Sequence, residues 1–196
     1  MKLVRRRDCL FGVPAAGLAA ALGTPAQAQS RDSGNPPEEI ARSLVYRYCR
    51  SLDRLDAPLL QSCFHPDAVI DMGTIYRGPA GAFVDVAMQF MGGMSATRHV
   101  VGNVLNVGDG FESYVDAWHL VQRDAGWREL NVRGRYLHRV AFRARRWAFI
   151  YHGEVVDYGS EQAADRSWFD GRIGLPRGTR GRDDASARLM AGAPGR

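Results

Sequence analysis

The feature that most restricts the fold of this chain is a succession of four long strand candidates in its second half. Apolar and polar residues alternate there with the period of two that is typical of half-buried strands, over about 96–107, 111–123, 128–142 and 146–158. The turns between them are short, at Gly108-Asp109-Gly110, Asp124-Ala125-Gly126 and Arg143–Arg146. Because turns this short join antiparallel neighbours, the sequence predicts an antiparallel meander.

Helical patterns precede the meander. A column of apolar residues at spacing four predicts an amphipathic helix from Glu38, with Ile40, Leu44, Tyr48 and Leu52 on one face. Asp56 is placed to cap a second, shorter helix, and Pro58 fits its first turn. A short strand follows at Ala68–Met72, and Gly78-Pro79 opens a third helix that runs to about Met91. Helices followed by a meander indicate an α+β fold with helices on one face of a curved sheet.

The two ends of the chain differ in composition from its middle. Residues 1–28 combine a basic start, an apolar run of about 14 residues and Ala26-Gln27-Ala28, the pattern of a secretory signal. The Arg6-Arg7 pair resembles a twin-arginine export motif, so we expect export to a bacterial periplasm. Residues 29–37 have a linker composition, 38–159 form the predicted domain, and the Arg/Gly-rich tail 160–196 is expected to be partly disordered.

The charge distribution argues against nucleic acid as a partner. The formal net charge is +5, but residues 29–159 hold 15 Arg and 15 Asp or Glu, so the excess lies in the leader and the tail. Phosphate binding requires cations clustered on the folded face. The apolar run in the leader is too short for a membrane span.

Other common chemistries lack their sequence signatures. The chain has no dinucleotide-binding, P-loop or nucleophile-elbow motif and no Cys/His cluster with zinc spacing, so we predict no cofactor and no metal. A disulfide between Cys49 and Cys63 in an oxidising compartment is an open alternative to two buried thiols.

Two residues break the pattern of their own segment. Asp53 continues a second apolar column of the first helix, formed at spacing four by Ala41, Val45 and Cys49. His99 alternates in phase with inward-facing residues of the first long strand, Asn103 included. A carboxylate turning into solvent at a helix end and a core histidine with a satisfied ring are the plain alternatives. Together the two residues would make a dyad, with the imidazole as general base and the carboxylate orienting it.

The motifs around these residues resemble those of the nuclear-transport-factor-2-like superfamily, and within it the SnoaL-like branch. The resemblance covers about 38–158 and rests on Leu52-Asp53-Arg54, Tyr76-Arg77-Gly78-Pro79-Ala80-Gly81, Arg98-His99-Val100-Val101-Gly102-Asn103 and a late strand with Trp147. It implies a cone-shaped fold in which a bent sheet wraps around helices and encloses a deep pocket. It also implies an Asp53–His99 pair that works without a cofactor, as in scytalone dehydratase and hexachlorocyclohexane dehydrochlorinase, and a homodimer or homotrimer joined through the outer sheet face.

Several further residues are candidates for contact with the substrate. Where the dehydrochlorinases have a lysine before the aspartate and an arginine after the tryptophan, this chain has Tyr48 and His152, which suit an oxygen leaving group better than a halide. His119 lies near the second pocket histidine of the dehydratases. Asn103 is expected to face inward with His99, and Tyr76 is a candidate for the pocket wall.

We therefore predict a cofactor-independent lyase of the dehydratase type, acting on a small hydrophobic aromatic or alicyclic hydroxylated compound. A formaldehyde-releasing carbon–carbon lyase on a lignin-derived diaryl compound and a keto-isomerase would use the same pocket. A non-catalytic small-molecule-binding protein of the same fold, or a dimeric scaffold without a pocket, are the alternatives from other functional classes.

Overall fold

The computed structural model describes residues 37–172 and 174–190. The predicted signal 1–28 lies outside this range, as does the predicted linker except for Pro37, so both remain predictions. Within the described residues, no helix is both long enough and apolar enough to cross a membrane.

Three helices and two short strands precede the meander, in the order α1 (Glu38–Arg54), α2 (Ala57–Ser62), β1 (Phe64–Asp71), β2 (Arg77–Pro79) and α3 (Ala80–Gly92). The long strands follow as β3 (Ala96–Val107), β4 (Gly110–Arg123), β5 (Gly126–Arg143) and β6 (Arg146–Ala163). The tail contains α4 (Ser167–Asp170), a 3₁₀ turn η1 (Gly181–Asp183) and α5 (Ala185–Met190). The four predicted long strands are present, and β6 continues beyond the predicted domain boundary at 159.

Local chemistry explains where the first two helices meet. α1 is capped at its C-terminus by Leu55, whose backbone is left-handed (φ 53°). The Leu55 N–H donates to the Leu52 carbonyl and the next N–H, of Asp56, donates to the Ser51 carbonyl. The Asp56 carboxylate then accepts a hydrogen bond from the Leu59 N–H at 2.9 Å and caps α2. α1 ends and α2 begins just after Asp53, so this residue lies in the last turn of α1.

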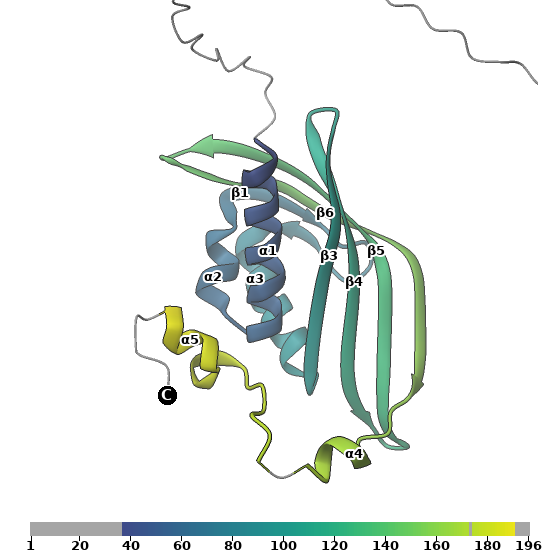
Figure 1. The fold of residues 1–196 in the computed structure, drawn as a ribbon. Helices are drawn as coiled ribbons and strands as arrows, with labels where there is room; N and C mark the ends of the chain where they lie inside the picture. Colours follow the sequence, from purple (N-terminus) through teal and green to yellow (C-terminus); the bar gives the residue numbers. More distant parts are fainter. Residues whose placement is uncertain (1–36, 173, 191–196) are drawn as a thin grey trace, which may run out of the picture. The chain divides into compact units, whose positions relative to one another are not determined.

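The six strands form one curved sheet in the order β2-β1-β6-β5-β4-β3. The pairs are antiparallel except β1 with β6, which is parallel. Figure 1 shows α1, α2 and α3 on one side of this sheet, and the core between the layers is rich in aromatic residues, among them Tyr48, Phe64, Phe111, Tyr136 and Phe149. The predicted α+β class with helices packed in a bent antiparallel meander is confirmed.

A bulge in β3 corrects one prediction. The pairing of β3 with β4 shifts between Val101 and Val104, so the inward phase that begins at His99 does not continue to the end of the strand. Val104 is buried, whereas Asn103 is exposed. The prediction that Asn103 faces inward with His99 is therefore wrong, because the extra residue of a bulge reverses the alternation.

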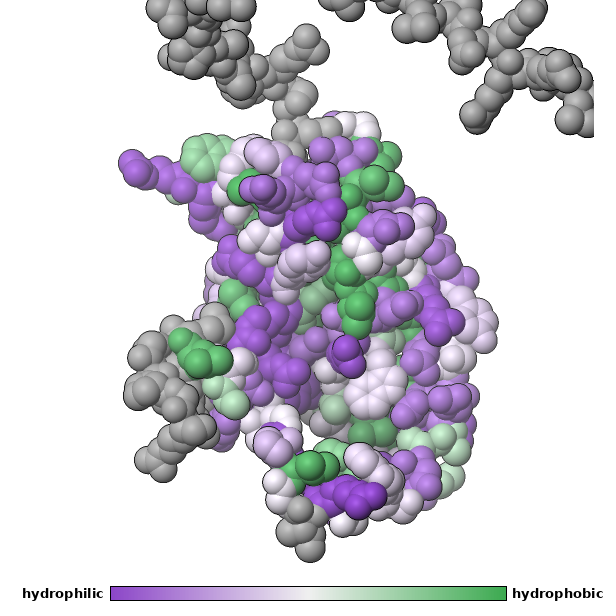
Figure 2. Space-filling view, in the orientation of Figure 1, coloured by the Kyte–Doolittle hydropathy of each residue, from purple (hydrophilic) through white to green (hydrophobic). Residues whose placement is uncertain are grey.

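β3 is an edge strand with exposed apolar side chains both before and after the bulge. Val100, Leu105 and Val107 are each about half exposed, and apolar side chains gather along the sheet beside α1 in Figure 2. The helices show a mainly hydrophilic surface in the same view.

The tail makes defined contacts with the domain. The Arg166 guanidinium lies 4.2 Å from the centre of the Trp127 ring at the start of β5. Within the tail, the Arg177 guanidinium lies 4.0 Å from the ring centre of Phe169. Further along, Arg54 donates a hydrogen bond to the Thr179 carbonyl at 3.0 Å. The tail therefore returns to α1 after leaving the sheet.

Two histidines form a buried pair in the sheet. His138 and His152 are direct neighbours on β5 and β6, and their Nδ1 atoms lie 3.1 Å apart, so one ring donates and the other accepts. Burial lowers the pKa of His138 well below 6.5 and that of His152 from 6.5 to about 3. Both rings are therefore neutral at physiological pH.

We expect this pair to make the fold sensitive to acid. Below about pH 6.5 the histidines of the unfolded chain bind protons that the buried rings of the folded chain do not. The free energy of unfolding therefore decreases as the pH is lowered. At about pH 5 the His152 ring lowers the free energy of unfolding by roughly 2 kcal/mol relative to pH 7, and His138 acts in the same direction. Urea unfolding at both pH values measures this loss, which should be smaller by about that amount in His152→Leu. An equal loss in both proteins would contradict the assignment.

Candidate active site

The last turn of α1 and the start of β3 bring Asp53 and His99 together. His99 Nδ1 lies 2.7 Å from Asp53 Oδ1, and the backbone N–H of His99 donates to Oδ2 at 3.0 Å. Thr97 donates its hydroxyl to Oδ1 at 2.9 Å. The side chains of His99 and Asp53 are only 3% and 11% exposed. The two residues that broke the sequence pattern are thus in direct contact.

The carboxylate of this pair is ionised. Burial raises the pKa of Asp53, but the hydrogen bonds and charge of His99 and the hydrogen bond from Thr97 outweigh burial and lower the pKa below its usual value. A carboxylate accepts a proton-bearing nitrogen, so Nδ1 of His99 carries the hydrogen. Nε2 remains without a protein hydrogen-bond partner among the described residues and can act as a base.

His99 lines an internal cavity of about 240 Å³ between the helices and the sheet. Most of its wall is apolar, with three methionines, and the polar groups are few. The lining residues are Tyr48, Leu52, Met72, Ile75, Phe83, Val86, Ala87, Phe90, Met91, Met94, His99, Ala117, His119, Leu130, Val132, Tyr136, Glu154 and Val156. Asp53 is absent from this wall and borders a separate groove between α1 and β3, so it lies behind His99 as seen from the cavity.

His119 joins His99 at the cavity wall from the neighbouring strand β4. The two rings meet edge to face, with centroids 5.4 Å apart and an angle of 79°. Neither ring nitrogen of His119 has a hydrogen-bond partner of normal geometry in the described part of the chain. Burial and the nearby charge of His99 lower the pKa of His119 from 6.5 to about 4, against a weaker opposing contact with the Leu130 backbone. His119 is therefore a neutral ring that can bond to a ligand.

Glu154 is a cavity residue that the sequence analysis missed. It lies on β6 and lines the cavity together with His99 and Tyr48. Burial raises the pKa of Glu154, with the charge of His99 opposing the shift. The signal that could have found it is the one that found Asp53, an acidic residue on the inward face of an element. The register of β6 against β5 shifts between Phe149 and Tyr151. This bulge interrupts the alternation of inward and outward residues along β6, so the sequence does not reveal that Glu154 faces inward.

The remaining predicted site residues divide into one that reaches the cavity and two that do not. Tyr48 lines it, and burial raises the pKa of its phenol well above 10. Tyr76 is not part of the wall, because its hydroxyl donates to the Pro79 carbonyl at 2.7 Å and its ring packs on Phe83. His152 also lies outside the wall, fully buried behind Tyr48 with ring centroids 4.4 Å apart.

The described residues contain no group of three or more His, Cys, Asp or Glu arranged to hold a metal ion. Cys49 and Cys63 are both buried free thiols, and burial raises the pKa of Cys63 to about 11. The alternative of a disulfide between them is not what the structure shows.

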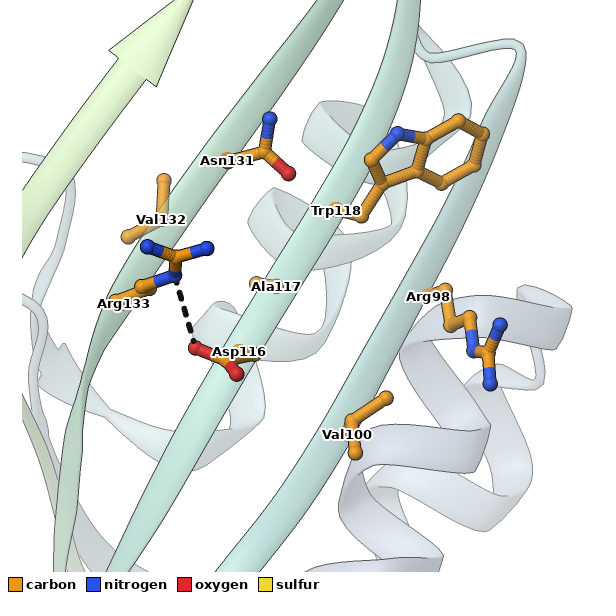
Figure 3. A pocket seen from close by; sticks show the side chains of 8 residues that line it. All are labelled: Arg98, Val100, Asp116, Ala117, Trp118, Asn131, Val132 and Arg133. Atoms are coloured by element: carbon orange, nitrogen blue, oxygen red, sulfur yellow. Dashed lines mark ion pairs between the residues drawn. The ribbon is translucent and has the colours of Figure 1, made fainter.

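A second hollow lies on the opposite face of the sheet. It measures about 390 Å³ and is bordered by β3, β4 and β5 through Arg98, Val100, Asp116, Ala117, Trp118, Asn131, Val132 and Arg133. Figure 3 shows an ion pair in this hollow, between Arg133 and Asp116 at 3.4 Å, and both of those side chains are more than half exposed. Its charges face solvent, so we place the chemistry in the internal cavity. The predicted homodimer or homotrimer would use this outer face and remains a prediction.

Known proteins with this fold include enzymes. No curated protein sequence matches the chain, but many solved structures do. A scytalone dehydratase-like protein from Novosphingobium aromaticivorans is 17% identical, with a TM-score of 0.55 over 71% of this chain and 94% of its own. Hexachlorocyclohexane dehydrochlorinase LinA-type3 from Novosphingobium barchaimii is 19% identical, with a TM-score of 0.52 over 71% and 94%.

A third solved structure, a protein from Kribbella flavida, is 18% identical and has a TM-score of 0.56 over 62% of this chain and 91% of its own. At these identities the likeness concerns the fold. The sequence pattern of the SnoaL-like domain matches residues 38–151, from the first turn of α1 into β6. The chain therefore belongs to the SnoaL-like domain family of the nuclear-transport-factor-2-like superfamily.

Proposed function

We propose that this protein is a cofactor-independent lyase that removes water from a small hydroxylated compound. The observation that supports the proposal most directly is the contact between His99 and the buried, ionised Asp53 at the wall of an apolar cavity. In this arrangement a carboxylate orients one nitrogen of the imidazole and leaves the other available, which is what proton abstraction requires.

In the proposed reaction His99 Nε2 takes a proton from a carbon atom of the substrate. The electron pair of the broken C–H bond forms the new double bond, and the neighbouring C–O bond breaks. Asp53 stabilises the imidazolium that results, because its charge lies 2.7 Å from Nδ1. The leaving oxygen takes a proton from an acid on the wall and departs as water, so atoms and charge balance when His99 returns its proton to that acid.

We propose Glu154 as that acid, with Tyr48 as a further hydrogen-bond donor. Both line the cavity, and a carboxyl whose pKa is raised is a better proton donor near neutral pH than a phenol whose pKa is also raised. His152, which the sequence analysis offered for this role, lies outside the cavity wall.

The cavity also indicates the class of substrate. Its volume of about 240 Å³ and its mainly apolar wall suit a compound of one or two rings. No Lys or Arg belongs to that wall among the described residues, so an uncharged aromatic or alicyclic alcohol fits better than a carboxylate or a phosphate. Dehydratase-like and dehydrochlorinase neighbours of the same fold support a lyase, although likeness of fold does not specify the reaction.

A panel of hydroxylated aromatic and alicyclic compounds tests this function. We expect at least one to lose water when incubated with the protein, seen by mass spectrometry and by the ultraviolet absorbance of the new double bond. Formaldehyde release or a shifted double bond without loss of water would instead identify the carbon–carbon lyase or the isomerase. Saturable binding of panel members without turnover of any of them would make the protein a carrier.

A further inference from the structure

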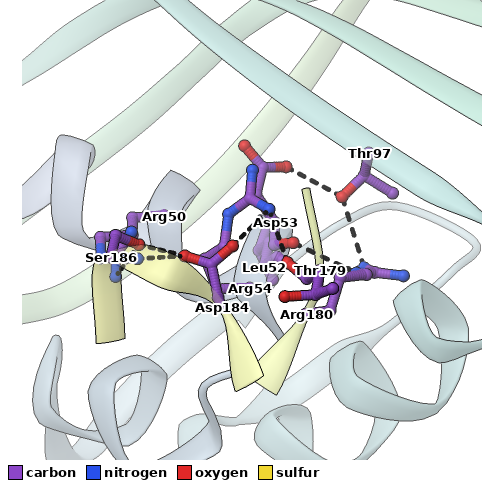
Figure 4. Close-up of polar contacts among 9 residues, drawn as sticks. All are labelled: Arg50, Leu52, Asp53, Arg54, Thr97, Thr179, Arg180, Asp184 and Ser186. Atoms are coloured by element: carbon purple, nitrogen blue, oxygen red, sulfur yellow. Dashed lines mark hydrogen bonds and ion pairs between the residues drawn. The ribbon is translucent and has the colours of Figure 1, made fainter. Parts of the chain in front are cut away.

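The C-terminal tail returns to the active site and packs against the end of α1. Arg54 of α1 forms an ion pair with Asp184 at 3.5 Å, and Arg50 donates to the Ser186 hydroxyl at 3.1 Å. Figure 4 shows these residues beside Asp53 and Thr97, with Arg180 reaching in from the tail. The segment 179–186 therefore lies next to the Asp53–His99 pair.

Arg180 uses all of its hydrogen-bonding capacity at this place. A guanidinium has five N–H donors, and each of the five has an acceptor. The acceptors are the carbonyl oxygens of Leu52 at 3.3 Å, Asp53 at 3.1 Å, Met91 at 2.9 Å and Met94 at 2.9 Å, and the Thr97 hydroxyl at 3.4 Å. The guanidinium thus joins the last turns of α1 and α3 to the start of β3, and helix C-termini favour a cation.

These contacts reach Asp53 from two sides. One guanidinium nitrogen holds the Asp53 carbonyl, while another donates to the Thr97 hydroxyl. A hydroxyl has a single hydrogen. The Thr97 hydroxyl oxygen accepts a hydrogen bond from Arg180, which leaves its hydrogen to be donated to the Asp53 carboxylate at 2.9 Å. Arg180 therefore orients both the backbone and the side-chain partner of the residue that orients His99.

The same guanidinium also contacts the cavity wall. Met91 and Met94 line the cavity, and their carbonyls share one nitrogen of Arg180. The Arg180 side chain therefore helps to fix the distance between His99 and the part of the cavity wall formed by Met91 and Met94. Lysine could not reproduce this, because its ammonium has three donors at a single point.

We propose that Arg180 is a positioning residue of the active site, which sets the Asp53–His99 pair from the C-terminal tail. The inference rests on the proposed function. It makes the tail segment 179–186 part of the catalytic machinery, although it lies outside the predicted domain.

The test compares Arg180→Ala and Arg180→Lys with Arg177→Ala. Arg177 is a matched control because it also donates to backbone carbonyls, those of Phe169 and Arg172, but within the tail itself. With the substrate from the panel, we expect Arg180→Ala to lower kcat by about tenfold or more, because small misplacements of a base are costly. KM should change by less than about threefold, since Arg180 does not line the cavity, and Arg177→Ala should match the wild type.

Two readouts distinguish positioning from general support of the fold. Adding guanidinium at low millimolar concentration should restore part of kcat in Arg180→Ala but not in Arg180→Lys, whose ammonium occupies the site. In proton NMR of the free protein, the Nδ1–H of His99 should give a downfield signal that shifts or exchanges faster in Arg180→Ala and is unchanged in Arg177→Ala. The NMR readout needs no substrate and therefore does not depend on the lyase assignment.

The outcomes separate this inference from the proposed function. Unchanged kcat and an unchanged His99 signal in both Arg180 variants would overturn the role of Arg180 and leave the lyase in place. A perturbed His99 signal in a protein that turns over no compound would support the positioning role and contradict the lyase. If Arg180→Ala does not fold, Arg180→Lys carries the comparison, and wild-type behaviour of that variant would refute the need for a planar guanidinium.

Discussion

Replacing His99 by alanine is expected to lower kcat/KM by about 100-fold or more, because positioned acid–base catalysis contributes at least that factor. The expectation follows from the place of the imidazole, held by Asp53 at 2.7 Å and bordering the apolar cavity. Water in the cavity of His99→Ala could not replace the imidazole, since no other group on the described part of the wall combines a free nitrogen with an ionised partner. Steady-state kinetics on the substrate from the panel measures the effect.

Asp53→Asn extends the same test to the second residue of the pair. The asparagine side chain keeps the shape but not the charge that stabilises the imidazolium, so we expect a loss of about tenfold or more in kcat with little change in KM. His65→Ala is a suitable control, because His65 is a buried histidine that bonds to the Ala141 carbonyl and does not line the cavity. A His99→Ala protein that folds and retains activity within about threefold would overturn the proposed base.

Gly134→Ala is expected to destabilise the fold strongly, because β5 and β6 approach each other too closely at this position to admit a side chain. A Cβ there would lie 2.2 Å from the Val155 carbonyl oxygen and 3.1 Å from Val156 Cα. These are backbone atoms of β6 that cannot rotate away, and the pairing of β5 with β6 is irregular at this point, between Arg133 and Gly134. The strands must separate where the sheet bends, and we expect a cost of about 3 kcal/mol in the free energy of unfolding.

Gly159→Ala is the matched control for this effect. Gly159 lies on the same strand pair, but a Cβ there would meet only the Asn131 carbonyl oxygen at 3.7 Å, an ordinary contact. Its unfolding free energy should stay within about 0.5 kcal/mol of wild type, the usual range for surface substitutions. Urea denaturation measures both variants, and equal stabilities would show that the close approach of β5 and β6 at Gly134 is not required.

The elements of the fold could be read from the sequence because they depend on local periodicity. Alternation with period two and three short turns predicted β3 to β6, and spacing four predicted α1 with Asp53 on its buried face. His99 and Asp53 were identifiable for the same reason, since each is a polar residue at an apolar position of a regular element. The resemblance to the SnoaL-like branch supplied their pairing, which spacing cannot show.

The residues that sequence reasoning misplaced lie next to irregularities. Asn103 is in the bulge of β3, where one extra residue turns the side chain outward, and Glu154 lies on β6 between two shifts of register. A bulge is set by how two strands fit together, and neither strand contains it alone. Tyr76 and His152 were expected at the cavity but pack on Phe83 and Tyr48 outside its wall, because the elements packed around a side chain decide whether it reaches the cavity.

The sequence by itself therefore determined the order of the first three helices and the four long strands, and the two residues of the candidate dyad, because these follow from short-range patterns along the chain. The resemblance of its motifs determined the family. Only the tertiary structure decided that Glu154 and His119 line the cavity with His99 and that Arg180 of the tail holds the end of α1. Arg180 and Asp53 are 127 positions apart. Their contact arises from the chain topology and from the need of buried carbonyls for hydrogen-bond donors. Neither of these produces a periodic pattern in the sequence.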